Sequence, residues 1–419
     1  MYPLYVAYSI YRMLLPKDEQ ELSLEEAQEY WRRALEDHLF VLCQTTMAVA
    51  ITKRTLSGYT GNPVNAIYLT KLLERMENQR RLANKLRNPA TWGKEGDNKM
   101  KFNAVVGNPP YQQSDGGSKA SAVPIYQRFV YQAKTIEPDY ISMITPAKWF
   151  SGGRGLDSFR NEMMNDRRIA KLIEYANSLD LFSNVDIAGG LCYFLWDKKH
   201  NGKCELTNVT AEGRITKDRF LNEYSVIIKN NKAIPILEKV RALEEKTLES
   251  IVSSQKPFGL RTYEKPDDEG ELFLRWSGGI GPIKRERVTA GLGMIEKWKV
   301  MISYLTAEHA GQPDKNGQYR VLSTNEILAP QYICTETYLI AGAFDTEAEA
   351  KNYLAYLRTR LVRFLILLVA TTQHISQSSF SFVPMQDFTR EWKESDLYEK
   401  YGLSEDEIAT IENLIKPMD

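Results

Sequence analysis

The loop at residues 108–111, Asn-Pro-Pro-Tyr, carries the residue types best suited to chemistry. It follows the apolar run 102–106, which has the composition of a buried strand. Proline has no backbone N–H and holds the residue before it in extended geometry, so the strand must end here. Ligands of open α/β sheets bind at the carboxyl ends of strands, and we expect this loop to lie at such an end.

The polar groups of this loop suit the recognition of an exocyclic amine. Asn108 has a carbonyl acceptor and an NH₂ donor on a short side chain, and the carbonyl of Pro109 lies close by on a stiff backbone. Two adjacent acceptors can hold both hydrogens of an amine, while the ring of Tyr111 can lie flat against a base. The alternative is a proline-rich turn that only ends a strand, because a short motif is a hypothesis.

The sequence GNPPY after an apolar strand resembles the target-amine motif of adenine-N6 DNA methyltransferases. The segments that follow are similar in order to those of type IIG-like restriction–modification methylases: YISMITPAKWF (140–150), IAKLIEYANSLDLF (169–182), DIAGGLCYFLW (186–196) and the tail at 382–415. The resemblance implies a doubly wound, Rossmann-like α/β methyltransferase sheet. It also implies methyl transfer from S-adenosylmethionine to adenine N6 of double-stranded DNA, in a restriction–modification or phage-defence context.

This chemistry requires base flipping, because N6 of a stacked adenine cannot reach the cofactor. The resemblance assigns the catalytic roles to Asn108, Pro109, Pro110 and Tyr111. Asn108 and the carbonyl of Pro109 would hold the amine, and Tyr111 would stack on the base. No residue needs to form a covalent bond, so catalysis would come mostly from proximity and orientation.

The cofactor half of the site departs from the resembled family. A Gly-rich loop should precede the first helical segment, yet no acidic residue with GxG occurs in the first hundred residues. The acidic residue expected after the second strand is replaced by Cys43 and Gln44, which are the candidate cofactor-binding residues. We therefore expect the sheet to lack its first strand. An upstream extension of the chain or a separate chain could supply the cofactor loop.

Two further groups of residues are candidates for DNA contacts. Phe194 and Trp196 fall on one face of an expected strand, where one of them can form the second wall of a base pocket opposite Tyr111. Core packing is the alternative role for each of these aromatic residues. The second group is basic and can line a DNA groove: Lys284, Arg285 and Arg287, with Arg275 and Trp276 nearby.

The composition limits the classes of function. Lys plus Arg and Asp plus Glu both number 54 among 419 residues, so a DNA-binding surface must come from local clustering of charge. No signal peptide is evident and no apolar run reaches the roughly 18 residues of a membrane helix, so no membrane association is expected. Four scattered cysteines without a CxxC pair and four scattered histidines indicate no metal site and fit a reducing cytoplasm.

The length and patterning indicate two domains. Residues 1–200 are expected to form an N-terminally incomplete methyltransferase domain, and residues 201–419 a mixed α+β target-recognition domain with a helical C-terminal tail. Residues 102–106, 141–145 and 191–196 are expected to be neighbouring central strands of one mostly parallel sheet. The patterns also predict a helix around residues 65–86 and one long helix over residues 346–373.

Two other functions remain open on the sequence. A non-catalytic DNA-binding or specificity protein that has lost cofactor binding would have no affinity for S-adenosylmethionine. An enzyme with another substrate is the third hypothesis, because NPPY loops also occur in enzymes that methylate glutamine side chains or RNA adenines. The large second domain favours a long duplex as the substrate.

Overall fold

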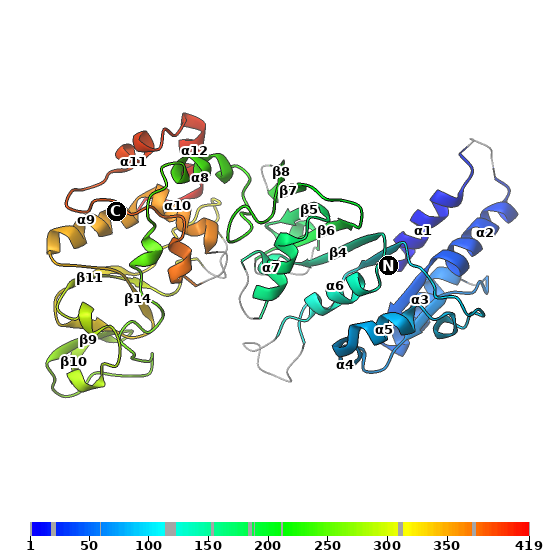
Figure 1. The fold of residues 1–419 in the computed structure, drawn as a ribbon, viewed down its shortest axis with the longest axis horizontal. Coiled ribbons are helices and arrows are strands. Elements are labelled where there is room, and N and C mark those ends of the chain that lie inside the picture. Colours follow the sequence, from blue (N-terminus) through cyan, green and yellow to red (C-terminus); the bar gives the residue numbers. More distant parts are fainter. Residues whose placement is uncertain are drawn as a thin grey trace. The chain divides into compact units, whose positions relative to one another are not determined.

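The computed structural model describes residues 2–17, 22–58, 60–113, 123–151, 155–182, 187, 189–210, 213–308, 313–370 and 374–418. The chain forms two compact units, and each is considered by itself (Figure 1). Unit 1 comprises Met1–Val106 and Ile125–Ile141, and unit 2 comprises Gly107–Pro124 and Ser142–Asp419.

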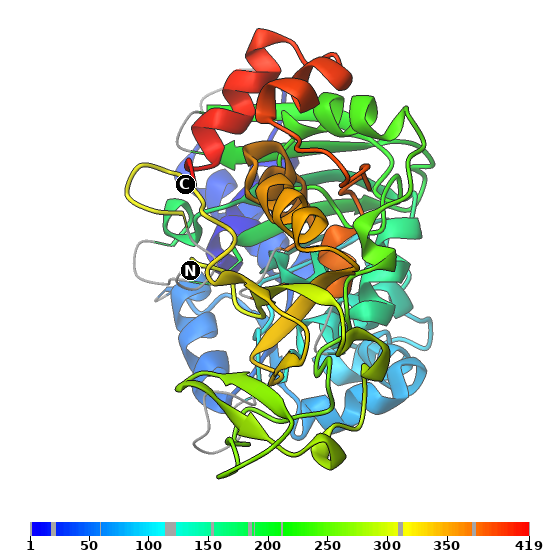
Figure 2. The same ribbon diagram turned by 90° about the vertical axis from the view of Figure 1, so that its left-hand side faces the viewer.

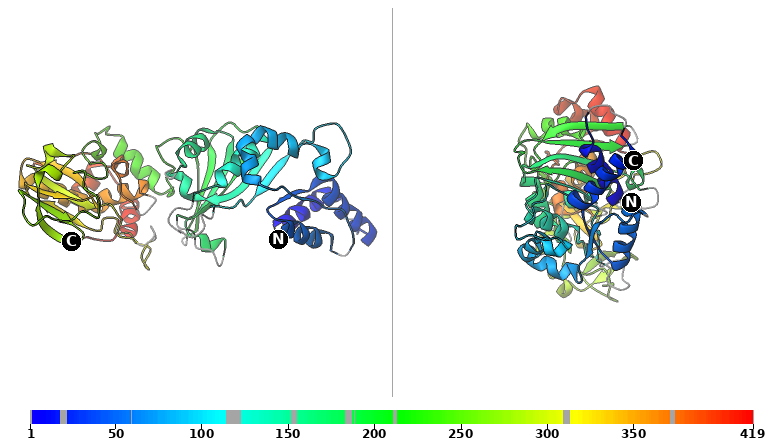
Figure 3. Two further views of the ribbon diagram at one scale, coloured as in Figure 1. Left: turned by 90° about the horizontal axis from the view of Figure 1, so that it is seen from below. Right: turned by 90° about the vertical axis from the view of Figure 1, so that its right-hand side faces the viewer.

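Three helices begin unit 1 and enclose a small apolar core. They are α1 (Tyr2–Leu14), α2 (Leu24–Arg33) and α3 (Thr46–Ser57), with a π-helical turn at Ala34–His38. Ser23 begins α2 through a capping box with Glu26, in which each side chain accepts from the other residue's backbone N–H. The helices lie side by side in Figure 3 (left), and Leu35, Leu39 and Leu56 are buried between them.

A parallel pair of short strands, β1 (Phe40–Cys43) and β2 (Asn65–Tyr68), follows in unit 1. The helix expected around residues 65–86 is therefore wrong at its start. Asn65 accounts for the strand, because its side-chain amide donates to the backbone carbonyls of Leu35, Glu36 and Leu39 at 3.1, 2.7 and 3.0 Å. The helical remainder of unit 1 consists of α4 (Leu72–Arg75), α5 (Gln79–Leu86) and α6 (Tyr126–Thr135), with 3₁₀ turns at Met76–Asn78 and Pro89–Trp92.

The largest sheet has six strands in the order β3-β4-β6-β5-β7-β8. The strands are β3 (Ala104–Gly107), β4 (Tyr140–Pro146), β5 (Ile169–Tyr175), β6 (Leu191–Asp197), β7 (Cys204–Thr210) and β8 (Gly213–Arg219). The α/β fold class is confirmed, and the three strands expected from the sequence are neighbours in this order. β3 ends the order, however, and so is not a central strand.

The sheet is mixed. β5 pairs with β7 in parallel, but β5 with β6 and β7 with β8 are antiparallel. Two residues join β7 to β8, a connection that only an antiparallel pair allows. β7 and β8 also carry the sheet past the boundary expected at residue 200, as far as Arg219. In unit 2, α7 (Asp157–Asn165) and the 3₁₀ turn Ala147–Phe150 lie between β4 and β5 along the chain.

The rest of unit 2 is a mixed α and β region around a large apolar core that includes Ile302, Leu339 and Phe364. It begins with α8 (Ala233–Arg241) and contains two three-stranded sheets, ordered β10-β9-β13 and β12-β11-β14. Their strands are β9 (Leu272–Trp276), β10 (Gly279–Ile283), β11 (Trp298–Ser303), β12 (Asn325–Leu328), β13 (Tyr332–Cys334) and β14 (Tyr338–Phe344). The C-terminal helices α11 (Glu394–Lys400) and α12 (Glu405–Leu414), red in Figure 2, lie beside the green α8.

The long helix expected over residues 346–373 is two helices, α9 (Glu347–Arg358) and α10 (Arg360–Val369). Thr359 separates them because its backbone is extended, with ψ 149°, and its hydroxyl accepts a hydrogen bond from Val362 N at 3.4 Å. The hydroxyl thus caps a new helix instead of continuing the old one. Among the described residues, no helix has both the length and the apolar character needed to cross a membrane.

Candidate active site

The loop at residues 108–111 directly follows β3, at the carboxyl end of that strand, as expected. Asn108 is exposed, Pro109 is buried, and Tyr111 is half-buried. Just beyond the loop the chain pairs with itself, because Gln113 N donates to the carbonyl of Val123 at 3.1 Å. The loop therefore presents one polar side chain to solvent and turns one aromatic ring partly inward.

The hydroxyl of Tyr111 is buried and makes no hydrogen bond of good geometry to any residue that the structure describes. Burial raises the pKa of this phenol to about 12, and the neighbouring thiol of Cys192 contributes to the rise. The side chain of Asn108 is close enough to oppose the rise. A buried hydroxyl without a partner costs free energy, so the inward position of this ring must be held by packing.

Tyr111 stands next to a row of buried polar side chains that crosses four strands of the sheet. The row consists of Thr145 on β4, Cys192 on β6, Glu174 on β5 and Asn208 on β7. Thr145 Oγ1 and Cys192 Sγ are 3.3 Å apart, Glu174 pairs in register with both Cys192 and Asn208, and Asn208 Nδ2 donates to Glu174 Oε2 at 3.4 Å. Burial raises the pKa of Cys192 to about 12, so its thiol is protonated and is not a nucleophile.

Glu174 is the one carboxyl group in this row and is only 1% exposed. Its Oε1 has no hydrogen-bond partner among the described residues, and Lys229 Nζ lies 3.7 Å away. Burial raises the pKa of Glu174, while the ammonium of Lys229 and the amide of Asn208 oppose that rise. The group is thus costly to bury and only partly compensated.

The segment around Lys229 runs across the ends of these strands and is attached at alternate residues. Ile227 N donates to the carbonyl of Phe150 after β4, at 3.1 Å. Lys229 Nζ donates to the carbonyl of Gly189 before β6, at 2.6 Å. Asn231 N donates to Asn208 Oδ1 on β7, at 3.0 Å. We call this segment, residues 227–231, the strap; it leads from the sheet into α8.

The turn that enters β6 depends on a glycine. Gly190 has φ +77°, and a Cβ at this position would lie 2.4 Å from the carbonyl oxygen of Tyr175 at the end of β5. Its own carbonyl accepts a hydrogen bond from Ala147 N after β4, at 3.0 Å. The close approach of three strand ends therefore requires a residue without a side chain.

The two aromatic candidates lie elsewhere. Phe194 is buried in the sheet, 1% exposed, which fits the alternative of core packing. Trp196 pairs with Ile169 at the start of β5, so it lies at the opposite end of β6 from Cys192. Its indole N–H donates to Asp166 Oδ2 at 2.9 Å. The structure does not bring Trp196 to Tyr111. Because β6 runs antiparallel to β5, the last residues of β6 lie beside the first residues of β5, away from Cys192 and Tyr111.

The basic candidates of residues 275–287 are largely paired with carboxylates. Arg287 contacts Glu264 at 2.8 Å and Asp267 at 2.6 Å, and both carboxyls have pKa values below their usual range. Arg285 contacts Glu296 at 3.2 Å, and half of its side chain is exposed. Arg275 pairs with Glu326 at 3.0 Å, beside Trp276. Lys284 has no ion pair among the described residues.

The cofactor candidates belong to unit 1, at the end of β1. Cys43 is buried, and its sulfur lies 3.7 Å from Thr52 Oγ1, so the thiol faces the interior. Gln44 is exposed and can offer its amide to a hydroxyl group. A ribose diol is best held by a carboxylate, which neither residue provides. These two residues therefore fit S-adenosylmethionine poorly, and no step is derived through the cofactor.

Several residues of the site escaped the sequence analysis: Thr145, Glu174, Gly190, Cys192 and Lys229. A signal existed for Glu174, because a carboxylate stands within the apolar run LIEYA. Lys229 gave none, since its partner lies on a different element of the chain.

The sequence comparisons agree with the resemblance. The sequence model of the Eco57I restriction-modification methylase family matches residues 37–182. A protein of Mycoplasma pneumoniae, described as an uncharacterized adenine-specific methylase, is 35% identical over 145 residues, which are 33% of this chain and 34% of that protein. The chain thus spans about a third of the length of this relative.

Solved structures are similar to this chain at low sequence identity. The type IIL restriction–modification enzyme MmeI in complex with DNA matches with a TM-score of 0.48 and 8% identity, over 98% of this chain and 66% of that chain. The type IIG restriction endonuclease BpuSI matches with a TM-score of 0.38 and 10% identity, over 96% of this chain and 60% of that chain.

The matched segment, residues 37–182, includes the strand-end loop and is similar to the Eco57I restriction-modification methylase family.

Proposed function

We propose that this chain is the methyltransferase part of a restriction–modification or phage-defence enzyme that methylates adenine N6 in duplex DNA. The observation that carries the proposal is the position of Asn108 and Tyr111 directly after β3, in a segment of the methylase family. The relative's description as an adenine-specific methylase supports adenine as the target.

In this mechanism the target adenine leaves the duplex, because its N6 is out of reach while stacked. Asn108 Oδ1 and the carbonyl of Pro109 would accept the two amine hydrogens and so fix the orientation of the nitrogen. Pro110 stiffens the loop, and the face of Tyr111 stacks on the base. The buried thiol of Cys192 lies near enough to the hydroxyl of that ring to affect its pKa.

S-adenosylmethionine supplies the methyl group in this proposal. At the end of β1 the exposed Gln44 has only an amide to offer it, and the thiol of Cys43 is buried. The chain's own residues position the amine and exclude water around Tyr111. Their contribution is orientation, which is effective only when donor and acceptor stand roughly 3–3.5 Å apart.

The test is methylation of unmethylated plasmid DNA in cells expressing the chain, with N6-methyladenine measured by mass spectrometry of nucleosides. Asn108→Ala should abolish the signal without unfolding the protein, because Asn108 is exposed. Gln113→Ala, another exposed amide near the loop, is the matched control and should leave the signal unchanged. Methylation that survives Asn108→Ala would refute the assignment.

A non-catalytic DNA-binding protein is the second candidate, and the buried Cys43 in place of an acidic residue favours it. It predicts DNA binding with neither methylation nor affinity for S-adenosylmethionine. The remaining alternative is an enzyme that methylates RNA adenines or glutamine side chains. Assays with RNA and with glutamine-containing peptides distinguish it from a DNA methyltransferase. Methylation confined to either of those substrates would replace duplex DNA in the proposal.

A further inference from the structure

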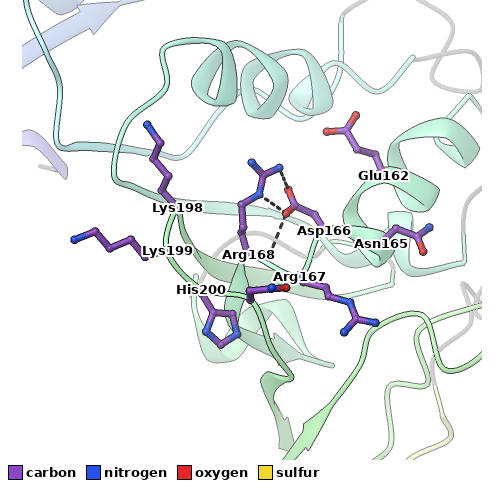
Figure 4. A pocket seen from close by; sticks show the side chains of 9 residues that line it. Glu162, Asn165, Asp166, Arg167, Arg168, Lys198, Lys199 and His200 are labelled. Atoms are coloured by element: carbon purple, nitrogen blue, oxygen red, sulfur yellow. Dashed lines mark hydrogen bonds and ion pairs between the residues drawn. The ribbon is translucent and has the colours of Figure 1, made fainter.

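A group of basic side chains gathers at one end of the strands, where β5 begins and β6 ends. Arg167 stands in the turn before β5, and Lys198, Lys199, His200 and Lys203 follow β6. We call these five residues the basic surface. Four of them, all except Lys203, line an open cavity of about 640 Å³ together with Glu162, Asn165, Asp166, Arg168 and Asn201 (Figure 4).

Carboxylates of the described residues do not neutralise the positive charge of the basic surface. Asp166, a carboxylate in the lining of the cavity, is held by Arg168 at 2.7 and 3.0 Å and by the indole N–H of Trp196 at 2.9 Å. In the part of the chain that the structure describes, Arg167 and the three lysines have no ion pair. This contrasts with Arg287, whose guanidinium is shared by two carboxylates.

The backbone under the basic surface is fixed before any ligand arrives. Gly202 N donates to the carbonyl of Arg167 at 3.3 Å, and Asp197 N donates to that of Arg168 at 2.8 Å, so the two turns are joined. Within the second turn, the side chain of Asp197 accepts a hydrogen bond from Lys199 N at 2.9 Å. Little backbone entropy would be lost on binding.

Phe220 gathers two of the cations. The guanidinium of Arg167 lies 4.4 Å from the centre of its ring, and the ammonium of Lys203 lies 5.8 Å from the same centre. Cation–π contacts of this kind hold the charges in place without neutralising them. The two cations thus stay available to an anion from outside.

The charged groups do not converge on a single point. Lys198 and Lys199 extend to one side of the cavity and Arg167 to the other (Figure 4). Such a divergent set suits an extended polyanion that crosses the surface better than one phosphate group. Duplex DNA, with a negative charge every ≈ 1.7 Å along its axis, is a polyanion of this kind.

The basic surface is separate from the candidate active site. It lies where β5 begins, whereas Glu174 and the strap lie where β5 ends, and a strand of seven residues spans roughly 20 Å. We propose that the basic surface is a second, sequence-independent binding site for the phosphate backbone of duplex DNA. The choice of DNA as ligand rests on the proposed function, but binding here requires neither methyl donor nor flipped base.

The test is fluorescence anisotropy of a labelled mixed-sequence duplex, titrated with the full chain over a series of salt concentrations and without cofactor. The double variant Lys198→Glu/Lys199→Glu should weaken binding roughly tenfold at low salt. The slope of log affinity against log salt should become shallower by about 0.9 for each lost phosphate contact. Arg167→Gln should act in the same direction with about half the change in slope.

The matched control is Lys315→Glu/Lys351→Glu, which makes the same change of net charge at two exposed lysines elsewhere in unit 2. The control should bind DNA with the wild-type slope. Equal weakening by both double variants would mean that only net charge matters, and unchanged binding by Lys198→Glu/Lys199→Glu would mean that DNA binds elsewhere; either result overturns the proposal. Asn108→Ala should retain this binding, so loss of methylation alone concerns the proposed function and leaves the basic surface intact.

Discussion

Lys229 Nζ lies 3.7 Å from Oε1 of the buried Glu174 and donates a hydrogen bond of 2.6 Å to the carbonyl of Gly189. This pair is the middle attachment of the strap. One residue on the way into α8 thereby holds both the end of β5 and the turn that enters β6. The stability of the sheet edge beside Tyr111 therefore depends on a residue distant in sequence.

Replacement of Lys229 by methionine should lower the free energy of unfolding by about 1–3 kcal/mol, because Glu174 loses the ammonium group that offsets the cost of burying its carboxylate. Urea denaturation followed by tryptophan fluorescence measures the change. Lys229→Arg should recover part of the loss, and the double variant Lys229→Met/Glu174→Gln should cost less than the sum of the single changes. Additive costs would show that the two side chains do not interact.

The raised pKa of Glu174 predicts a pH dependence of stability. The folded state holds this proton more tightly than the unfolded chain, whose glutamate titrates near pH 4.3. The stabilisation is complete below that pH and is lost as pH rises through the folded pKa. The free energy of unfolding of the wild type, minus that of Glu174→Gln, should therefore fall as pH rises from about 4.3 toward neutrality. A difference that rises instead would contradict the raised pKa.

Gly190→Ala should destabilise the turn that enters β6. The variant combines the cost of a positive φ, roughly 1–3 kcal/mol, with a clash against the carbonyl of Tyr175. Gly317→Ala is the matched control, because its φ is +78° and no atom of the described residues lies within 4 Å of the added Cβ. Thermal midpoints should fall further for Gly190→Ala than for Gly317→Ala. Equal midpoints would show that the turn can shift to admit a side chain.

The strand-end loop could be predicted from the sequence because its cause is local. Two prolines end β3 whatever surrounds them. β2 could not be predicted, since its pairing depends on β1 and on the three carbonyls held by Asn65. The break at Thr359 between α9 and α10 interrupts an apolar periodicity that continues through it. Such a cap is visible only once the backbone is known.

The candidate site was predicted only in part, because local motifs can be read from the sequence and contacts between distant segments cannot. Asn108 and Tyr111 carry their signal in a contiguous motif, whereas Glu174 and Lys229 meet only in the folded chain. Phe194 or Trp196 was a candidate for the wall opposite Tyr111, with core packing as the alternative, but the direction of a strand within its sheet cannot be read from that strand alone. Its antiparallel course sends Trp196 to the edge that carries the basic surface.

Arg287→Ala should affect stability more than DNA binding. Its guanidinium is shared by Glu264 and Asp267. Its removal leaves each carboxylate with a backbone N–H as its remaining partner, that of Arg261 for Glu264 and that of Lys284 for Asp267, so stability should fall. Lys284→Ala/Arg285→Ala should instead flatten the salt dependence of DNA affinity by about one unit of slope per phosphate contact. Urea denaturation and anisotropy measure the two effects. A stable Arg287→Ala protein with weakened DNA binding would reverse this assignment.

Two substitutions of Tyr111 distinguish the role of its ring from that of its hydroxyl. Tyr111→Phe removes a buried hydroxyl without a hydrogen-bond partner, so the fold should be unchanged or slightly more stable, and methylation should persist. Tyr111→Ala removes the stacking surface, which is worth about 1–3 kcal/mol per base, and should lower methylation at least tenfold. Nucleoside mass spectrometry provides the readout. Loss of methylation in Tyr111→Phe would assign the hydroxyl a direct role.

The last prediction concerns the methyl donor, for which Gln44 and Cys43 are poor ligands. Neither residue gives the ribose hydroxyls a carboxylate. Each tenfold loss of affinity corresponds to about 1.4 kcal/mol of binding free energy. Calorimetric titration of the 419-residue chain with S-adenosylmethionine should therefore show binding weaker than micromolar. Gln44→Glu should strengthen binding, because a carboxylate then stands at the end of β1. Gln28→Glu, an equally exposed change on α2, should have no effect. Micromolar affinity of the unaltered chain would mean that other residues complete the cofactor site, and the weak-binding prediction would be abandoned.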